Sequence, residues 1–118
     1  MGRLSTHVLD TAHGRPAMGV AYELRRLDAP DRWVLIASGR TNADGRTDQP
    51  LLAGDAFKTG TYQLIFDIGA YFALQNIALA TPPFLDRIPL QFTIADGDGH
   101  YHVPLLASPW SYSTYRGS

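Results

Sequence analysis

Cysteine is absent from this chain of 118 residues, which excludes disulfides, thiolate metal sites and a cysteine nucleophile. Charge of one sign is not in excess either. Ten Lys and Arg residues stand against 11 Asp and Glu residues, for a formal net charge of -1. We therefore expect no nucleic-acid partner, because phosphate binding needs a concentrated basic face. No apolar run approaches the roughly 20 residues of a membrane-spanning helix, so we expect no membrane partner.

Neither end of the chain carries a recognisable targeting signal. The first residues, MGRLSTHVLD, include a charge but no apolar stretch followed by a small-residue cleavage site, so a secretory signal is not expected. The last three residues, Arg116-Gly117-Ser118, do not match a peroxisomal signal of the SKL type. A cytoplasmic protein is the expectation that follows.

Hydrophobic residues make up 45% of the chain, and its length is close to the commonest domain size. We therefore predict a single domain over residues 1–118. Short alternating segments separated by turn residues predict an all-β sandwich of seven or eight strands with one short helix. Strands are expected at residues 5–10, 20–27, 33–38, 51–53, 61–67, 88–94, 101–106 and 111–116, of which 51–53 is at most very short.

Turns and exceptions to the alternation refine this prediction. Residues 28–31 and 42–45 are typical turn sequences, and residues 96–99 suggest a hairpin turn. Bulky residues recur at helical spacing between Ile68 and Leu79, which predicts one helix of two or three turns. Pro89 cannot donate a hydrogen bond to a sheet, so its position is expected at an edge or a bulge.

Alternation also assigns the polar side chains to faces. Ser5, His7 and Leu9 share one side of the first strand, while His100 and His102 lie opposite an apolar row in the penultimate one. A histidine in a sandwich is more often an ordinary surface side chain than a catalytic one. His100 and His102 could also begin a metal site with His7 as the third ligand. Serine-nucleophile and phosphate-loop motifs are absent.

Three segments resemble a known family: LSTHVLDTAHGRPA at residues 4–17, TNADGRTDQPLL at 41–52, and YHVPLLASPWSYSTYRGS at 101–118. They are similar to the transthyretin-related family, specifically to its 5-hydroxyisourate hydrolase branch, over nearly the whole chain. An end so rich in aromatic and cationic residues is unlike an ordinary frayed terminus. The Tyr-Arg-Gly-Ser ending favours the enzyme over the hormone carriers of the family.

This resemblance implies a transthyretin-like sandwich that assembles as a homotetramer, a dimer of dimers, with sites at the interface between dimers. The implied reaction is hydrolysis of 5-hydroxyisourate to 2-oxo-4-hydroxy-4-carboxy-5-ureidoimidazoline in urate degradation, with no cofactor and no metal. The implied catalytic residues are His7, Arg46 and His102. The implied substrate-binding residues are His7, Arg46, Tyr115, Arg116 and Ser118.

Within that scheme His7 and His102 activate a water molecule, and Arg46 orients the substrate and offsets charge on the attacked carbonyl. His13, His100 and Arg40 keep ordinary structural interpretations. The alternative is a transthyretin-type carrier of a small aromatic hormone, without catalysis. That branch lacks the histidine at the His102 position and the Tyr-Arg-Gly-Ser ending. A β-rich interaction module with a decayed site is a third option, although all motif positions are intact.

Overall fold

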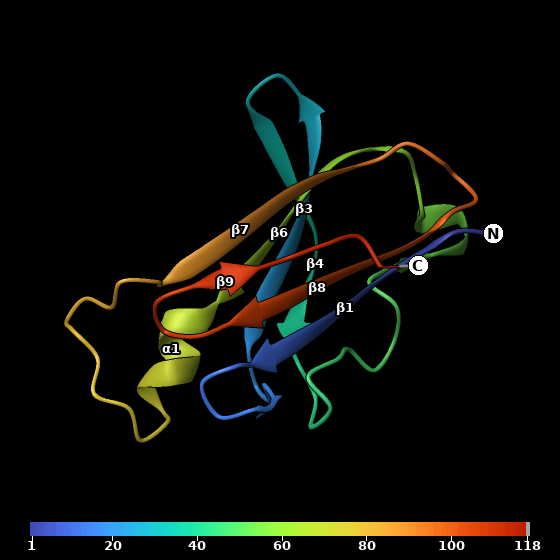
Figure 1. Cartoon of the computed structure of the whole chain (residues 1–118). Helices are drawn as coiled ribbons and strands as arrows, with labels where there is room; N and C mark the ends of the chain where they lie inside the picture. Colours follow the sequence, from blue (N-terminus) through green and yellow to red (C-terminus); the bar gives the residue numbers. More distant parts are fainter. Residues whose placement is uncertain (118) are drawn as a thin grey trace.

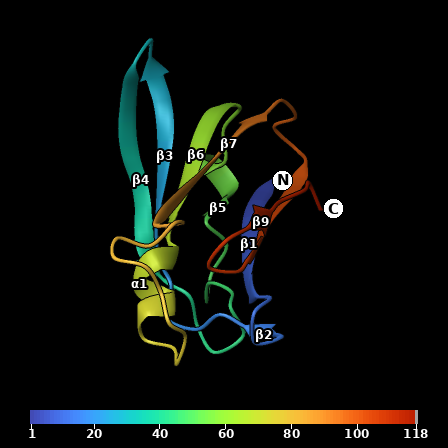
Figure 2. The same ribbon diagram turned by 60° about the vertical axis from the view of Figure 1, so that its left-hand side comes forward.

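The computed structural model describes residues 1–117 and shows two β-sheets packed face to face (Figures 1 and 2). One sheet has the strand order β2-β1-β8-β9, with β5 also paired to β1, and the other has the order β4-β3-β6-β7. The strands are β1 (Arg3–Asp10), β2 (Arg15–Pro16), β3 (Ala21–Ala29), β4 (Arg32–Arg40), β5 (Leu52–Ala53), β6 (Gly60–Asp67), β7 (Arg87–Ile94), β8 (His100–Ala107) and β9 (Tyr112–Ser113). A 3-10 turn, η1 (Gly54–Ala56), and one helix, α1 (Ile68–Ala73), complete the fold. The predicted all-β sandwich with one short helix is confirmed.

The core fills the space between the two sheets. Every second residue of β1 is buried, beginning at Leu4, and the alternate residues Ser5, His7 and Leu9 lie on the outer face. Each large apolar side chain that is fully buried, such as Phe66, contributes about 1.5–3 kcal/mol. This alternation fixes β1 against the core. The outward polar residues of β1 are therefore held in position on the outer face, although they are not part of the core.

The central pairing of the first sheet joins distant parts of the sequence. Strands β1 and β8 run parallel, with Ser5 opposite His102 and His7 opposite Pro104. Thr6, which points inward, donates a hydrogen bond from its hydroxyl to the Val103 carbonyl at 2.7 Å. Since partners in register share a face, the outward side chains of the two strands form one surface.

Three local predictions need correction. The helix ends at Ala73 instead of continuing toward Leu79. Leu74, the next residue, is 87% exposed, and Ile77 and Leu79 pack on the core from irregular chain, so these apolar residues do not form a further helical turn. Residues 96–99 turn between the two sheets and so do not close a hairpin. The last strand is limited to β9, after which the chain leaves β8 and returns beside it at Gly117.

One other feature follows the sequence more closely. Pro89 lies in β7, the edge strand of the second sheet, as predicted from its missing donor. No helix within residues 1–117 has the length and apolar character needed to cross a bilayer.

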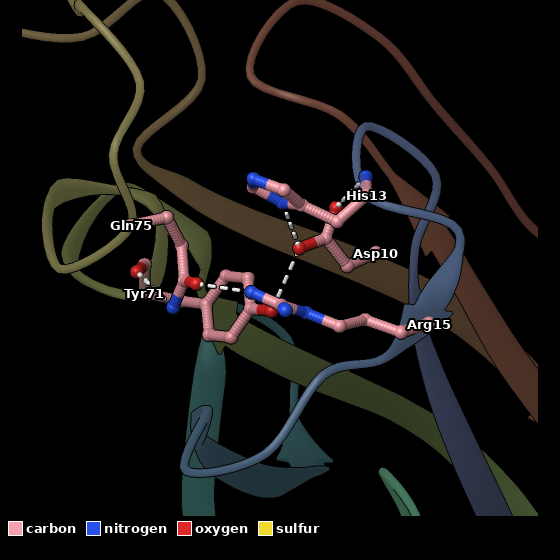
Figure 3. Close-up of polar contacts among 5 residues, drawn as sticks. All are labelled: Asp10, His13, Arg15, Tyr71 and Gln75. Carbon is pink, nitrogen blue, oxygen red and sulfur yellow. Dashed lines mark hydrogen bonds and ion pairs between the residues drawn. The ribbon is translucent and has the colours of Figure 1, made fainter.

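A buried carboxylate fixes the end of β1 to the helix (Figure 3). The side chain of Asp10 is fully buried and accepts a hydrogen bond from the Tyr71 hydroxyl at 2.7 Å. Its carboxylate also contacts His13 Nδ1 at 2.7 Å and accepts from the His13 backbone N–H at 3.0 Å. Arg15 in β2 also donates a hydrogen bond to the side-chain oxygen of Gln75, just after α1, at 2.8 Å. These contacts hold the loop after β1 against α1.

The ionisation of this cluster is strongly perturbed. Burial acts to raise the pKa of the Asp10 carboxyl, but hydrogen bonds from Tyr71 and His13 more than offset it and hold the pKa below its ordinary value. Burial and the neighbouring Asp10 carboxylate raise the pKa of Tyr71 to about 12. The folded state therefore favours a charged Asp10 beside a neutral Tyr71.

Replacing Tyr71 with Phe tests this anchor. The raised pKa of Tyr71 contributes stability that is present below the unfolded value of about 10 and is lost between about pH 10 and 12. Tyr71→Phe should therefore lower the free energy of unfolding at neutral pH by about 1–3 kcal/mol, since Asp10 loses a donor. It should also weaken the alkaline loss seen in urea titrations at increasing pH. Tyr112→Phe, at a half-exposed position, is the control; equal alkaline losses in all three proteins would contradict the assignment.

Candidate functional site

A cleft of about 330 Å³ opens on the outer face of the first sheet. It is lined by Arg3, Ser5, Arg46, His100, Tyr101 and His102. A shallower hollow of about 250 Å³ adjoins it and shares Arg3, Ser5 and Arg46. Larger hollows lie elsewhere, including one of about 490 Å³ over the outer face of the second sheet, but it contains no histidine. The cleft over β1 and β8 is therefore the best candidate, because titratable groups able to move a proton converge there.

Arg46 reaches this cleft because the loop before it is held tightly against β1. The Asn42 side-chain oxygen accepts hydrogen bonds from the backbone N–H groups of Asp44 at 2.9 Å and Arg46 at 3.1 Å. The Gly45 carbonyl in turn accepts from the Val8 backbone N–H at 2.7 Å. Gly45 has a φ of +72°, and a Cβ atom there would collide with the Val8 carbonyl oxygen. Only glycine allows so close an approach.

The two outward histidines of β1 and β8 share this positive environment. Burial and the Arg46 guanidinium lower the pKa of His7, against a smaller opposing effect of Asp44. Burial, Arg46 and His7 together lower the pKa of His102. The predicted catalytic residues His7, Arg46 and His102 are therefore close enough to influence one another's charge. Both imidazoles are biased toward the neutral form, which is the form that accepts a proton.

The C-terminal segment approaches the same place through Gly117. Its backbone N–H donates to the His102 carbonyl at 2.7 Å, and its carbonyl accepts from the His102 N–H at 3.4 Å. A Cβ atom at Gly117 would lie 2.9 Å from His102 Cδ2, so the glycine backbone packs directly on the imidazole. The C-terminal segment thus lies beside His102 at Gly117.

Two of the predicted substrate-binding residues lie elsewhere in this single chain. The Arg116 guanidinium stacks 4.1 Å from the centre of the Tyr101 ring and donates to the His100 carbonyl at 3.5 Å. Tyr115 and Arg116 line a separate groove of about 360 Å³ against β7. Ser118, the third predicted tail residue, lies outside the described residues.

Four residues that line the cleft were not predicted as site residues: Arg3, Ser5, Tyr101 and His100, the last of which was expected to be an ordinary surface side chain. Ser5 Oγ lies 2.9 Å from His102 Nδ1, and Arg3 lines both hollows. Alternation placed Ser5 on the same side as His7, but its contact with His102 depends on a parallel pairing across 97 positions of sequence. Among residues 1–117, no three His, Cys, Asp or Glu side chains are grouped so as to hold a metal ion.

Both the sequence and the fold of this chain match known proteins. A family model described as the HIUase/Transthyretin family matches residues 4–117. The chain is 57% identical to 5-hydroxyisourate hydrolase 2 of Rhizobium meliloti (strain 1021), over 99% of this chain and 97% of that one. It superposes on the crystal structure of (S)-allantoin synthase with a TM-score of 0.93 at 49% identity, over 99% of this chain but only 44% of that chain. It also resembles transthyretin from Sparus aurata, with a TM-score of 0.86 at 34% identity, over 98% of this chain and 96% of that one.

The electrostatic coupling can be measured directly by NMR titration of the histidines. Because Arg46 lowers the pKa of both His7 and His102, Arg46→Gln should raise both values while keeping a polar side chain of similar length. Arg40→Gln serves as the matched control, since Arg40 is bonded to the Gly19 carbonyl and lies outside the cleft. Unchanged titration of both histidines in Arg46→Gln would show that the arginine lies too far away to act on them.

Proposed function

This chain belongs to the HIUase/transthyretin family, and from this premise we propose that it hydrolyses 5-hydroxyisourate in urate degradation. The observation that carries the proposal is that Arg46 and His102 line one cleft on the outer sheet face, while His7 on β1 lies close enough to interact electrostatically with both. Two proton-accepting groups beside a fixed cation suit the attack of water on a carbonyl. The 57% identity to a protein named as a 5-hydroxyisourate hydrolase extends over nearly the full length of both chains and supports the same substrate.

Water is the nucleophile in the proposed reaction. One neutral imidazole of the His7/His102 pair takes a proton from a water molecule as the water oxygen adds to a ring carbonyl of the substrate. The carbon–nitrogen bond of the six-membered ring then breaks, and the departing nitrogen receives the proton. A lowered pKa keeps both histidines unprotonated at neutral pH, so each starts the cycle able to act as a base.

Arg46 stabilises the charge that develops on the attacked carbonyl oxygen. Its guanidinium presents several donors in one plane, which suits a heterocycle rich in carbonyl groups. The tail completes the proposal: Tyr115, Arg116 and Ser118 bind or orient the substrate. For Tyr115 and Arg116 this requires a neighbouring subunit, because they line a different groove in the single chain.

We therefore include a homotetramer, a dimer of dimers, in the proposal. The packed core leaves no room for a heterocyclic substrate, whereas a cleft between symmetric subunits does. Three aromatic residues after β8 are about half exposed in the single chain, namely Trp110, Tyr112 and Tyr115. Exposed aromatic side chains gathered in one segment are typical of a surface that another subunit covers. We also propose a cytoplasmic location, which cell fractionation would test.

The rival function is hormone transport, since transthyretins share the fold. A carrier needs an apolar channel for an aromatic ligand, whereas the cleft here is lined mainly by two arginines, two histidines and a serine. Such a lining favours polar chemistry on a carbonyl-rich substrate.

The decisive assay follows the ultraviolet decay of fresh 5-hydroxyisourate, made from urate by a uricase, in buffer containing EDTA. The protein should accelerate this decay, and His7→Ala, Arg46→Ala and His102→Ala should each lower turnover by about two orders of magnitude or more. His13→Ala is the control: it should lower the melting temperature, because His13 contacts buried Asp10, yet retain turnover. Full activity in the His7, Arg46 and His102 variants would refute the assigned roles.

The assembly is tested separately by mass in solution. We expect a particle of about four times the 13.0 kDa chain by light scattering. A monomer that retained full activity at the assay concentration would show that the site is complete within one sandwich.

A further inference from the structure

The contact between Ser5 and His102 assigns distinct tasks to the two nitrogens of this imidazole. Ser5 is the register partner of His102 across the parallel β1–β8 pair, and its Oγ lies 2.9 Å from Nδ1. Both backbones are fixed by the sheet, so the contact is held by two strands and does not depend on a flexible loop. Gly117 packs on the other side, against Cδ2 of the same ring and the Cβ atom that carries the ring. The imidazole is thereby confined in position and orientation.

This confinement leaves Nε2 as the nitrogen available to a ligand in the cleft. A neutral imidazole carries its proton on one nitrogen only, and the hydrogen bond made by the other nitrogen decides which. A serine hydroxyl can either accept from Nδ1–H or donate to a bare Nδ1. The first arrangement leaves a free lone pair on Nε2, whereas the second places a proton there and removes the basic atom from the cleft.

Two physical arguments favour the first arrangement. Two arginines place positive charge in the cleft: Arg46, which acts on His102, and Arg3, which is part of the lining. Positive charge favours a lone pair, not an N–H group, on the side of the ring that faces it. In addition, a protonated His102 must donate from both nitrogens, so Ser5 must then accept from Nδ1–H. If Ser5 already accepts in the neutral state, the hydrogen bond persists while Nε2 gains and loses a proton.

We propose that Ser5 is a positioning residue that holds neutral His102 as the Nδ1–H tautomer and so makes Nε2 the base that activates water. The step from tautomer to catalysis rests on the function proposed above. In the balanced step, a water proton moves to Nε2 as the water oxygen bonds to the substrate carbonyl carbon. The ring is then an imidazolium with Nδ1–H still donating to Ser5. Nε2 later returns the proton to the nitrogen released when the ring opens.

The tautomer can be read without any assay of activity. Nitrogen-15 NMR of the histidine side chains, recorded at a pH where His102 is neutral, distinguishes Nδ1–H from Nε2–H directly. We expect the wild-type protein and Ser5→Thr, which keeps the hydroxyl, to show Nδ1–H at His102. Ser5→Ala should shift His102 toward Nε2–H, because its Nδ1 loses the acceptor. Ser38→Ala, in β4 of the other sheet, is the matched serine control and should leave the tautomer unchanged.

Kinetics then test whether the tautomer matters. Ser5→Ala should lower kcat about tenfold, as expected for loss of one neutral hydrogen bond that orients a base, with little change in KM. Ser5→Thr should recover most of the rate. Wild-type His102 found as Nε2–H, or a Ser5→Ala variant with unaltered tautomer and kcat, would overturn the assignment. If wild type lacked hydrolase activity but showed the Ser5-dependent tautomer, the positioning would stand and only the proposed reaction would fall.

Discussion

The parallel pairing of β1 with β8 is the constraint on which the rest of the site depends. It places Ser5 beside His102 and His7 beside Pro104 in one fixed register. A slip of one residue would turn His7 inward, where Leu4 and Val8 are now fully buried. The hydrophobic alternation that stabilises the sandwich therefore also determines which polar groups face the cleft. The burial of apolar side chains therefore stabilises the fold and fixes the geometry of the site at the same time.

Strand β1 is also held from two further directions. At its end, buried Asp10 joins the following loop to α1 through His13 and Tyr71 (Figure 3). Along its edge, Val8 donates to the Gly45 carbonyl and so ties the Arg46 loop to the strand that carries His7. The position of Arg46 relative to His7 is thus set by backbone hydrogen bonds. A site built on such supports needs little reorganisation when charge develops in a reaction.

Sequence-based prediction succeeded for features set by local interactions and failed for features set by contacts between residues far apart in the sequence. Period-two alternation is a local property, and it located the longer strands and the outward faces of His7 and His102. The helix was predicted too long because Ile77 packs on the core from irregular chain, which residue spacing cannot distinguish from a further turn. The Ser5–His102 contact is separated by 97 positions, and nothing local to either residue specifies it. The association of Arg46 with the histidines came from family resemblance, because its cause is a loop contact made through Gly45.

The combination of a cation with two histidines resolves a tension in base catalysis. A lowered pKa keeps an imidazole unprotonated but also makes it a weaker base, so lowering it by burial alone would reduce the driving force for proton transfer. Here Arg46 contributes to the lowered pKa of both His7 and His102. In the proposed reaction, the same guanidinium would attract the negative charge that appears on the substrate as the proton leaves water. The interaction that, together with burial, weakens the base in the resting cleft would then also stabilise the product of its action.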